Sequence, residues 1–234
     1  MKVLCTICAR GGSKGLKNKN IKKLNNKPLI FYTIQSAINA KIFTNIVVST
    51  DSFKIRNKIK NMNVSCWFLR SKKLSTDKIS KLPVIQDTLR KAEKKFNIKY
   101  DYICDLDVTS PLRTKEDIIS SFYKIKKKNI DNVISACHSR KNPFFNMVLK
   151  KKGSYKLVID KKKYTRRQDA PKCFDLNASI YFWKRKALLK GKKIVGKNTA
   201  LYVMPRNRSV DIDTIEDFKY VEYLIYKSNG KSKF

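Results

Sequence analysis

Short apolar runs alternate along the first 136 residues with segments in which apolar residues recur every three or four positions. A short apolar run is typical of a buried strand, and the second spacing places apolar side chains on one face of a helix. The pattern predicts strands at residues 3–8, 46–49, 64–69, 102–106 and 133–136, and helices at residues 28–40, 52–60, 82–96 and 115–127.

Alternating strands and helices favour a parallel sheet, because each crossover between parallel neighbours is long enough to form a helix. Since such helices cover both faces of the sheet, we expect an α/β fold with a doubly wound, mostly parallel sheet. The rhythm breaks over residues 139–176, where lysine-rich turns beside two short strands predict a hairpin lobe outside the sheet. Strands at 178–183 and 201–204 and a closing helix at 215–226 complete one domain of residues 1–234.

The composition fits a folded chain with a strong positive charge. Of 234 residues, 42% are hydrophobic, which is enough to build a core. Lys plus Arg number 54 against 18 for Asp plus Glu, a formal net charge of +36. Such a charge is typical of nucleic-acid binders. Here the basic residues, mostly Lys, spread along the whole chain, so we interpret them as a coding bias with no nucleic-acid partner. A basic RNA-binding module stays the alternative from another class.

The sequence carries no signal for a membrane. Every apolar run is far shorter than the roughly 20 residues that span a bilayer. The apolar stretch at residues 3–8 is too short for a signal peptide. We therefore expect a cytoplasmic protein without a membrane partner.

Six cysteines lie mostly within apolar runs. Cys5 and Cys8 form a CxxC pair, but in a strand residues three apart point to opposite faces. We therefore expect reduced, buried thiols in place of a zinc site.

Glycines and basic residues follow the first predicted strand. Residues 9–20 read ARGGSKGLKNKN. Glycines let successive backbone N–H groups converge on an anion, and Arg10, Lys14 and Lys19 add positive charge. Ligands of open α/β sheets bind at the carboxyl ends of the strands, where this segment lies. We interpret it as a phosphate-binding turn, although it is neither a Walker loop nor a GxGxxG fingerprint.

Polar residues follow other predicted strands as well. Asp51 comes after the strand at 46–49, and we interpret it as a helix cap. Arg70 is either a phosphate contact or a solvated base. Asp107 comes after the strand at 102–106 and precedes a proline-stiffened turn, in which Thr114 is a candidate cap for the next helix.

Two carboxylates, Asp211 and Asp213, lie two residues apart. In extended backbone such residues share a face, so both can bind one hard cation through their oxygens. An equally open interpretation is a helix cap plus a surface acid, with Asp213 or Thr214 capping the closing helix. A shared magnesium nucleotide requires this pair and the glycine-rich turn to face each other across one cleft.

Together and in this order, the motifs resemble the cytidylyltransferases that activate nine-carbon acidic sugars, the CMP-sialic acid synthetase family. The resemblance covers nearly the whole chain and rests on ARGGSKGLKNKNI at 9–21, VVSTD at 47–51, TSPLR at 109–113, NASIYF at 177–182 and DID at 211–213. The stretches DLDVTSPLR, RKNPFFNMV and RRQDAPKCFDLNASIYFWKR are most similar to the bacterial branch that acts on legionaminic acid.

The resemblance implies a Rossmann-like nucleotidyltransferase fold, CTP and an acidic nine-carbon sugar as substrates, and a homodimer held by the lobe at 139–176. It implies Lys19, Arg10 and Asp211 as catalytic residues, with Asp211 and Asp213 carrying Mg²⁺. The implied nucleotide-binding residues are Arg10, Gly11, Gly12, Ser13, Lys14, Lys19, Asn20 and Arg70. The implied sugar-binding residues are Asp107, Thr109, Ser110, Arg113, Gln168 and Asn177.

One departure from the family pattern bears on the sugar. Many neuraminate enzymes have Gln-Pro before TSPLR, where this chain has Asp107-Val108. Since that Gln contacts the sugar, Asp107 argues against neuraminate itself. The alternative within enzymes is a cytidylyltransferase for an eight-carbon ulosonic acid, which shares the reaction.

Overall fold

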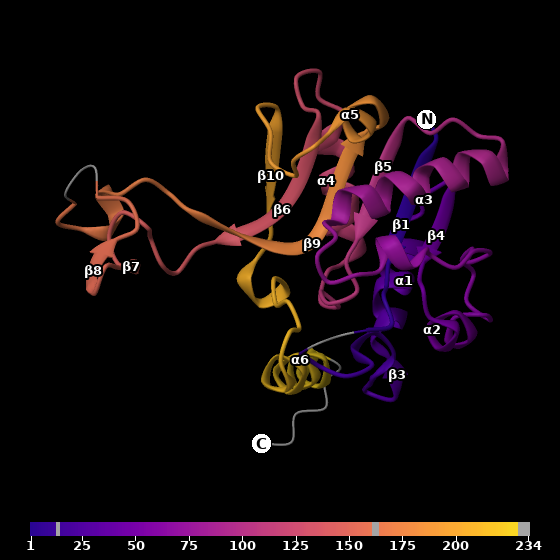
Figure 1. Ribbon diagram of the computed structural model, residues 1–234, viewed down its shortest axis with the longest axis horizontal. Helices are drawn as coiled ribbons and strands as arrows, with labels where there is room; N and C mark the ends of the chain where they lie inside the picture. Colours follow the sequence, from indigo (N-terminus) through magenta and orange to yellow (C-terminus); the bar gives the residue numbers. More distant parts are fainter. Residues whose placement is uncertain (13–14, 161–163, 229–234) are drawn as a thin grey trace.

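The computed structural model describes residues 1–12, 15–160 and 164–228. Within these residues the central sheet has the strand order β10-β6-β9-β5-β1-β4 (Figure 1). Its strands are β1 (Val3–Cys8), β4 (Asn45–Ser49), β5 (Tyr102–Leu106), β6 (Asn132–His138), β9 (Phe174–Lys184) and β10 (Thr199–Val203). β9 runs antiparallel to β5 and β6, whereas the other neighbours are parallel. The prediction of a mostly parallel sheet is confirmed.

Helices cover both faces of this sheet. They are α1 (Leu29–Ala40), α2 (Phe53–Lys58), α3 (Lys81–Phe96), α4 (Lys115–Ile125), α5 (Arg185–Lys190) and α6 (Ile215–Ser228). Neighbouring residues of β1 enter separate cores: Cys5 packs in a cluster with residues of α1, α4 and α6, and Leu4 packs in a second cluster with residues of α3 and α5. Because both faces of β1 are buried, its sequence is a continuous apolar run.

The cysteines follow this two-sided burial. Cys5 belongs to the first core cluster and Cys8 packs against the second, so the two thiols face opposite sides of the sheet as predicted. All six cysteines are free thiols, and burial raises the pKa of Cys5 and Cys8 well above its ordinary value. These thiols therefore act as small apolar side chains.

The helix caps confirm one prediction and correct another. Thr114 and Asp117 form a capping box at the start of α4, as the sequence indicated. The cap of α2 is Ser52, whose hydroxyl accepts the Ile55 N–H at 3.4 Å. The prediction that Asp51 is a cap was wrong, because its carboxylate instead accepts the Gly11 N–H at 2.8 Å.

Of the two candidate caps of the closing helix α6, Asp213 and Thr214, the structure shows Thr214 in this role. Its hydroxyl accepts the Asp217 N–H at 3.2 Å, and the Asp217 carboxylate accepts the Thr214 N–H at 2.8 Å. This reciprocal capping leaves the Asp213 side chain outside the helix and free for another role.

Two strand predictions were wrong in extent. The run at 64–69 forms only isolated bridges, through Ser65 and Leu69, beside the edge of the sheet. Between these two bridges, Trp67 packs edge-on against Phe96 of α3, with ring centroids 5.3 Å apart, and the chain forms no continuous strand. The strand predicted at 178–183 begins earlier, because residues 174–176 pair with β6 across a register shift.

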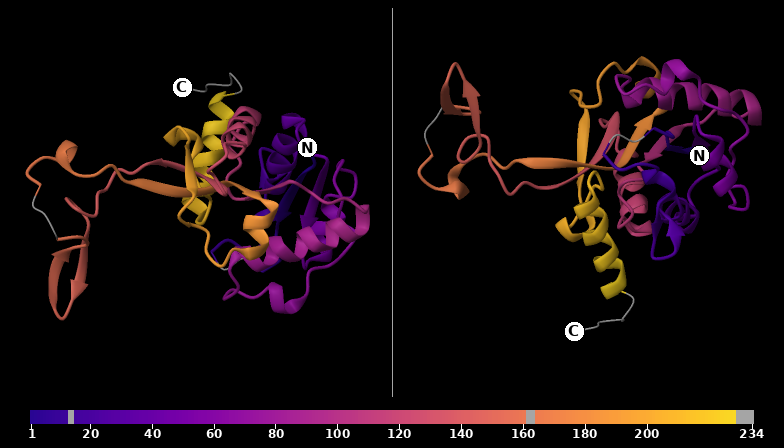
Figure 2. Two further views of the ribbon diagram at one scale, coloured as in Figure 1. Left: turned by 90° about the horizontal axis from the view of Figure 1, so that it is seen from above. Right: turned by 60° about the horizontal axis from the view of Figure 1, so that its bottom comes forward.

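The extended ends of β6 and β9 carry a lobe that stands away from the sheet (Figures 1 and 2). It holds the predicted hairpin, formed by β7 (Val148–Lys151) and β8 (Ser154–Leu157). Several large apolar side chains of this lobe are exposed, namely Met147, Val148, Leu149, Tyr155 and Val158.

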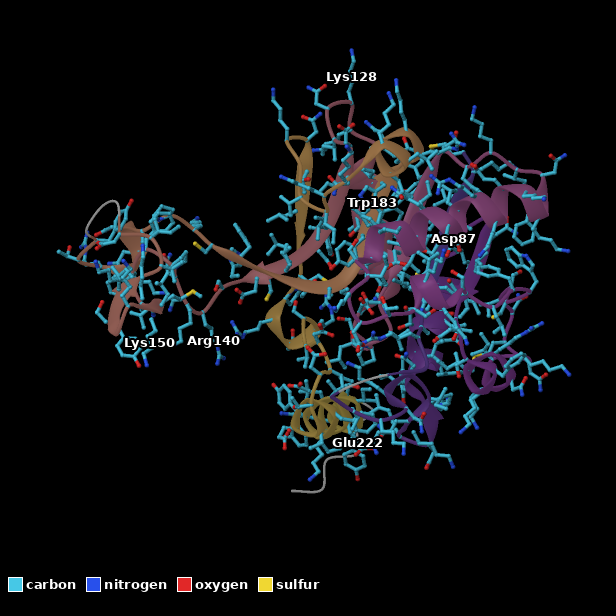
Figure 3. All side chains as sticks on the ribbon, viewed as in Figure 1. Asp87, Lys128, Arg140, Lys150, Trp183 and Glu222 are labelled. Atoms are coloured by element: carbon cyan, nitrogen blue, oxygen red, sulfur yellow. The ribbon has the colours of Figure 1, made fainter. Side chains whose placement is uncertain are left out.

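The remaining elements are short. They are β2 (Lys23–Leu24), β3 (Lys27–Pro28), and the 3-10 turns η1 (Lys19–Ile21), η2 (Lys72–Leu74), η3 (Arg167–Asp169) and η4 (Arg206–Arg208). In the described part of the chain, none of the helices combines the length and apolar character needed to cross a bilayer. Basic side chains occur both on the body of the domain and on the lobe, as Lys128 and Lys150 illustrate (Figure 3).

Candidate active site

A pocket of about 460 Å³ opens where β1 and β5 end, at the carboxyl edge of the sheet. It lies beside the turn after β1, the start of α3 and the segment that precedes α6. Its lining includes Arg10, Gly15, Lys19, Asn20, Arg70, Thr76, Asp77, Lys81, Asp107, Thr109 and Asp213. The pocket thus lies at the edge where ligands of open α/β sheets bind.

The glycine-rich turn and Asp213 of the late acid pair meet at this pocket, whose lining does not include Asp211. Lys19 Nζ donates to the carbonyl oxygen of Ile212 at 2.6 Å and to Asp213 Oδ1 at 3.0 Å. A Cβ atom on Gly15 would lie 2.5 Å from the carbonyl oxygen of Asp213, so only glycine permits this approach. The two segments therefore face one cleft, as the metal interpretation requires.

Several contacts fix the turn after β1. The Gly11 N–H donates to Asp51, and a Cβ at Gly11 would lie 2.9 Å from Cβ of Ser52. The buried Asn20 amide donates to the carbonyl oxygen of Arg10 at 2.9 Å. Gly12 is exposed with open space around its α-carbon. Ser13 and Lys14, two further predicted nucleotide-binding residues, lie outside the described residues.

Two arginines of the predicted nucleotide site line the same pocket. Arg10 forms an ion pair with Asp77. Arg70 is buried, donates from Nε to the Ser75 hydroxyl at 3.2 Å, and lies 3.9 Å from Asp51. The nearby carboxylates hold both guanidinium groups at the wall of the pocket. Their roles toward a nucleotide stay predictions.

A charged cluster that the sequence did not predict lies on the other side of the pocket. Lys81 Nζ lies 2.5 Å from Asp107 Oδ2 and 3.1 Å from Asp105 Oδ2, and 4.4 Å from the ring centroid of Tyr181. Burial alone would lower the pKa of Lys81, but the two carboxylates raise it well above its ordinary value. Burial would likewise raise the pKa of Asp107, but Lys81 holds it below its ordinary value. Both groups are therefore charged.

The acid pair has one exposed and one half-buried member. The Asp213 side chain lines the pocket, whereas Asp211 Oδ1 is buried without a hydrogen-bond partner among the described residues. Burial, together with the charges of Asp107 and Asp213, raises the pKa of Asp211 despite a hydrogen bond with Thr109. An unpartnered carboxylate oxygen beside a second carboxylate suits a hard cation. In the described chain no three His, Cys, Asp or Glu side chains form a metal cage.

Of the turn TSPLR, only Thr109 is part of the pocket lining. Ser110 is buried and donates to the Asn177 carbonyl oxygen at 3.1 Å. The buried Arg113 donates to the Ser179 carbonyl oxygen at 2.5 Å, to the Thr33 hydroxyl at 2.6 Å and to the carbonyl oxygen of Asp107. These bonds tie the end of β5 to α1 and β9. Direct sugar contacts from Ser110 and Arg113 stay predictions.

The other two predicted sugar-binding residues lie apart from the pocket lining. Asn177 is buried and donates from Nδ2 to the Ser209 hydroxyl at 2.9 Å, and its Oδ1 lacks a partner among the described residues. Gln168 lies in η3 on the lobe, where it lines a separate cavity of about 420 Å³ with His138 and Cys173. Within this chain the fold does not bring Gln168 to the pocket.

Comparison with known proteins identifies the family of the chain. A family model described as Cytidylyltransferase matches residues 4–231. The chain is 44% identical over 232 residues to the Post-translational flagellin modification protein B of Campylobacter coli, covering 99% of this chain and 98% of the relative. It is 44% identical, with the same coverage, to CMP-N,N'-diacetyllegionaminic acid synthase of Campylobacter jejuni.

A solved structure supports the fold. CMP:2-keto-3-deoxy-manno-octonic acid synthetase in complex with CTP superposes with a TM-score of 0.72 over 97% of this chain and 100% of that chain, at 15% sequence identity. At that identity the likeness concerns the fold alone, a mixed α/β architecture with a mostly parallel sheet. With a family model spanning nearly all of its length and full-length relatives at 44% identity, the chain belongs to the cytidylyltransferase family.

Proposed function

We propose that the protein couples CTP to a nine-carbon nonulosonic acid, legionaminate-like or neuraminate-like, and releases the CMP-sugar and pyrophosphate. The observation that carries this proposal is the contact of Lys19 with the acid segment, 2.6 Å from the Ile212 carbonyl oxygen and 3.0 Å from Asp213. It brings the proposed phosphate-binding turn next to Asp213, one of the two proposed metal ligands. The 44% identity to a CMP-N,N'-diacetyllegionaminic acid synthase supports the choice of sugar.

In the reaction, the anomeric hydroxyl oxygen of the sugar attacks the α-phosphorus of CTP in line. The bond from that phosphorus to the oxygen bridging the α- and β-phosphates breaks, pyrophosphate leaves, and the hydroxyl proton is released to solvent. Negative charge builds on the phosphate oxygens, so the protein must supply positioning and positive charge more than a nucleophile. Lys19, Arg10 and Arg70 lie at the pocket wall where they can supply that charge.

The proposed cofactor is Mg²⁺, held by Asp211 and Asp213. When bound, it would neutralise triphosphate charge and orient the phosphates. Asp213 also forms an ion pair with Lys19 at 3.0 Å, so this carboxylate would orient the Lys19 ammonium toward the α-phosphate. Gly12 leaves the turn backbone open to a phosphate, whereas the Gly11 N–H is engaged by Asp51 and fixes the turn.

We further propose a cytoplasmic homodimer. The six free cysteines fit a reducing compartment. The exposed apolar side chains of the lobe, among them Val148, Leu149 and Tyr155, fit a surface that a second copy covers. Light scattering on eluting protein measures the mass directly. We expect the wild type to be a dimer and the double variant Val148→Lys with Leu149→Lys to be a folded monomer, which would support contact through the lobe. A monomeric wild type would contradict the proposed dimer.

The test of activity incubates the protein with CTP, Mg²⁺ and one sugar at a time, and measures pyrophosphate. The panel contains N,N'-diacetyllegionaminic acid, N-acetylneuraminic acid and an eight-carbon ulosonic acid. Preference for the eight-carbon sugar would support the alternative enzyme, whose reaction is the same. Folded protein that releases pyrophosphate with none of them contradicts the proposal, and RNA binding that weakens steeply with salt would then favour the basic module.

A further inference from the structure

Lys81 occupies a position that local structure disfavours. It is the first residue of α3, where the partial positive charge of the helix end repels a cation. Its side chain is also mostly removed from water. Such a violation of a local preference at the wall of a pocket indicates a function of the site.

Two carboxylates and an aromatic ring surround the ammonium group of Lys81. Asp107 accepts a hydrogen bond from it, Asp105 forms an ion pair with it at 3.1 Å, and the Tyr181 ring faces it. Asp105 is itself fully buried and accepts from the Thr6 hydroxyl at 2.7 Å. The Lys81 ammonium is thus oriented toward two carboxylates, of which Asp107 accepts its hydrogen bond, so we expect it to act through Asp107.

Asp107 is the neighbour that reaches the pocket. One carboxylate oxygen accepts the Val108 N–H at 3.0 Å and the other accepts from Lys81. Each carboxylate oxygen can accept two hydrogen bonds, so two acceptor positions remain. The side chain is 22% exposed and lines the pocket, so these positions are open to a ligand.

We propose that Lys81 is a positioning residue that holds Asp107 as an ionised, acceptor-only group and thereby selects sugars that present an N–H or O–H donor to it. This inference rests on the proposed function. An amide at this place would offer a donor as well as an acceptor, whereas a carboxylate rejects a sugar that presents an acceptor there. Lys81 also neutralises part of the charge of Asp105 and Asp107, which would otherwise repel the acidic sugar and the triphosphate.

The experiment is a double-mutant cycle on Lys81→Met and Asp107→Asn, with Lys78→Met as the matched control. Lys78 is exposed in the same segment, and its replacement removes the same charge. Steady-state rates with CTP and each sugar of the panel give KM and kcat for both substrates, and thermal melting reports on folding. Lys81→Met leaves two carboxylates uncompensated and can fail to fold, but the double variant and Asp107→Asn avoid that repulsion.

We expect each single variant to raise KM for the preferred sugar at least tenfold, with KM for CTP changed less than threefold. In each single variant, the ratio of kcat/KM for the best sugar to kcat/KM for the worst sugar should be at least tenfold smaller than in the wild type. The double variant should be no worse than Asp107→Asn, since Lys81 acts through that charge. The proposal would be overturned if the losses of kcat/KM in the two single variants added up in the double variant, or if KM rose equally for the sugar and for CTP. An effect of Lys78→Met as large as that of Lys81→Met would overturn it as well. A wild type inactive with every sugar would instead overturn the proposed function.

Discussion

The carboxylate of Asp117 is held by the guanidinium of Arg208, whose Nη2 and Nε donate to its two oxygens at 2.8 and 3.1 Å. Asp117 lies in the first turn of α4 and is fully buried, and Arg208 lies in η4, three residues before Asp211. The Tyr202 hydroxyl donates to the same carboxylate at 3.0 Å. This network therefore anchors the start of the acid segment to the body of the domain.

Removing the charge of Asp117 should destabilise the protein. In Asp117→Asn the guanidinium loses a charged acceptor, and one amide N–H faces donors, so we expect the free energy of unfolding to fall by about 2 kcal/mol. Urea denaturation followed by circular dichroism measures this change. Glu116→Gln, on the exposed neighbour in the same turn, is the control and should change stability far less. Equal changes in the two variants would contradict the role of the buried pair.

The same pair predicts how stability depends on pH. Burial alone would raise the pKa of Asp117, but the hydrogen bonds from Arg208 and from the Thr114 N–H lower it below its ordinary value. A carboxyl whose folded pKa is depressed contributes stability above its unfolded pKa of about 3.9, and this contribution is lost as pH falls through the folded pKa. The difference in melting temperature between wild type and Asp117→Asn should therefore be constant from pH 7 to about pH 5 and shrink below about pH 4. A difference that grows on acidification contradicts this sign.

Features set by local chemistry could be predicted from the sequence, and features set by long-range contact could not. Thr114 could be predicted as a cap because a cap acts within one helical turn, and its partner in the structure, Asp117, lies three residues away. Asp51 was misassigned because Ser52 can cap as well, and only the approach of Gly11 from another strand decides between them. Lys81 was missed because its partners lie far away in the sequence, on β5, just after β5 and on β9. Locally, only the unfavourable position of a cation at a helix start marks it.

The order of the strands in the sheet could also not be predicted from the sequence pattern. The apolar run at 178–183 predicted a strand, but its place between β5 and β6, antiparallel to both, depends on where the lobe returns the chain. A strand that enters between two parallel neighbours has the same burial on both faces as they have, so its hydrophobic pattern carries no sign of direction.

Gly15→Ala should separate the two halves of the site. The added Cβ would lie 2.5 Å from the backbone carbonyl oxygen of Asp213, which cannot yield as a flexible side chain can. We expect kcat/KM for CTP to fall at least tenfold, because the displaced backbone would separate Lys19 from the Ile212 carbonyl oxygen and from Asp213. Gly196→Ala, whose Cβ would meet nothing closer than 3.9 Å, is the control. Equal activity in the two variants would contradict the close approach.

The metal proposal makes a prediction that does not depend on turnover. If Asp211 and Asp213 hold Mg²⁺ together with the triphosphate, CTP should raise the melting temperature more with Mg²⁺ than after chelation, because a ligand that binds the folded state stabilises it. Asp211→Asn should lose most of the Mg²⁺-dependent part of this rise. Asp87→Asn, which removes an acid paired with Lys91 on α3, should keep it. A rise that is equal with and without Mg²⁺ in the wild type contradicts a shared magnesium nucleotide.

Lys19→Ala and Asp211→Asn should each lower kcat on the order of a hundredfold or more, because both remove charge stabilisation that is needed as pyrophosphate leaves. Lys19 is the sharper case, since its ammonium is oriented by the Ile212 carbonyl oxygen and Asp213 and cannot be replaced by its neighbours. Lys17→Ala changes the same charge at an exposed position of the same turn and should keep at least half of the activity. Initial rates of pyrophosphate release at saturating CTP measure the effect. If Lys19→Ala and Lys17→Ala turn over alike, the turn supplies only general positive charge, and the contact between Lys19 and the acid segment has no part in the reaction.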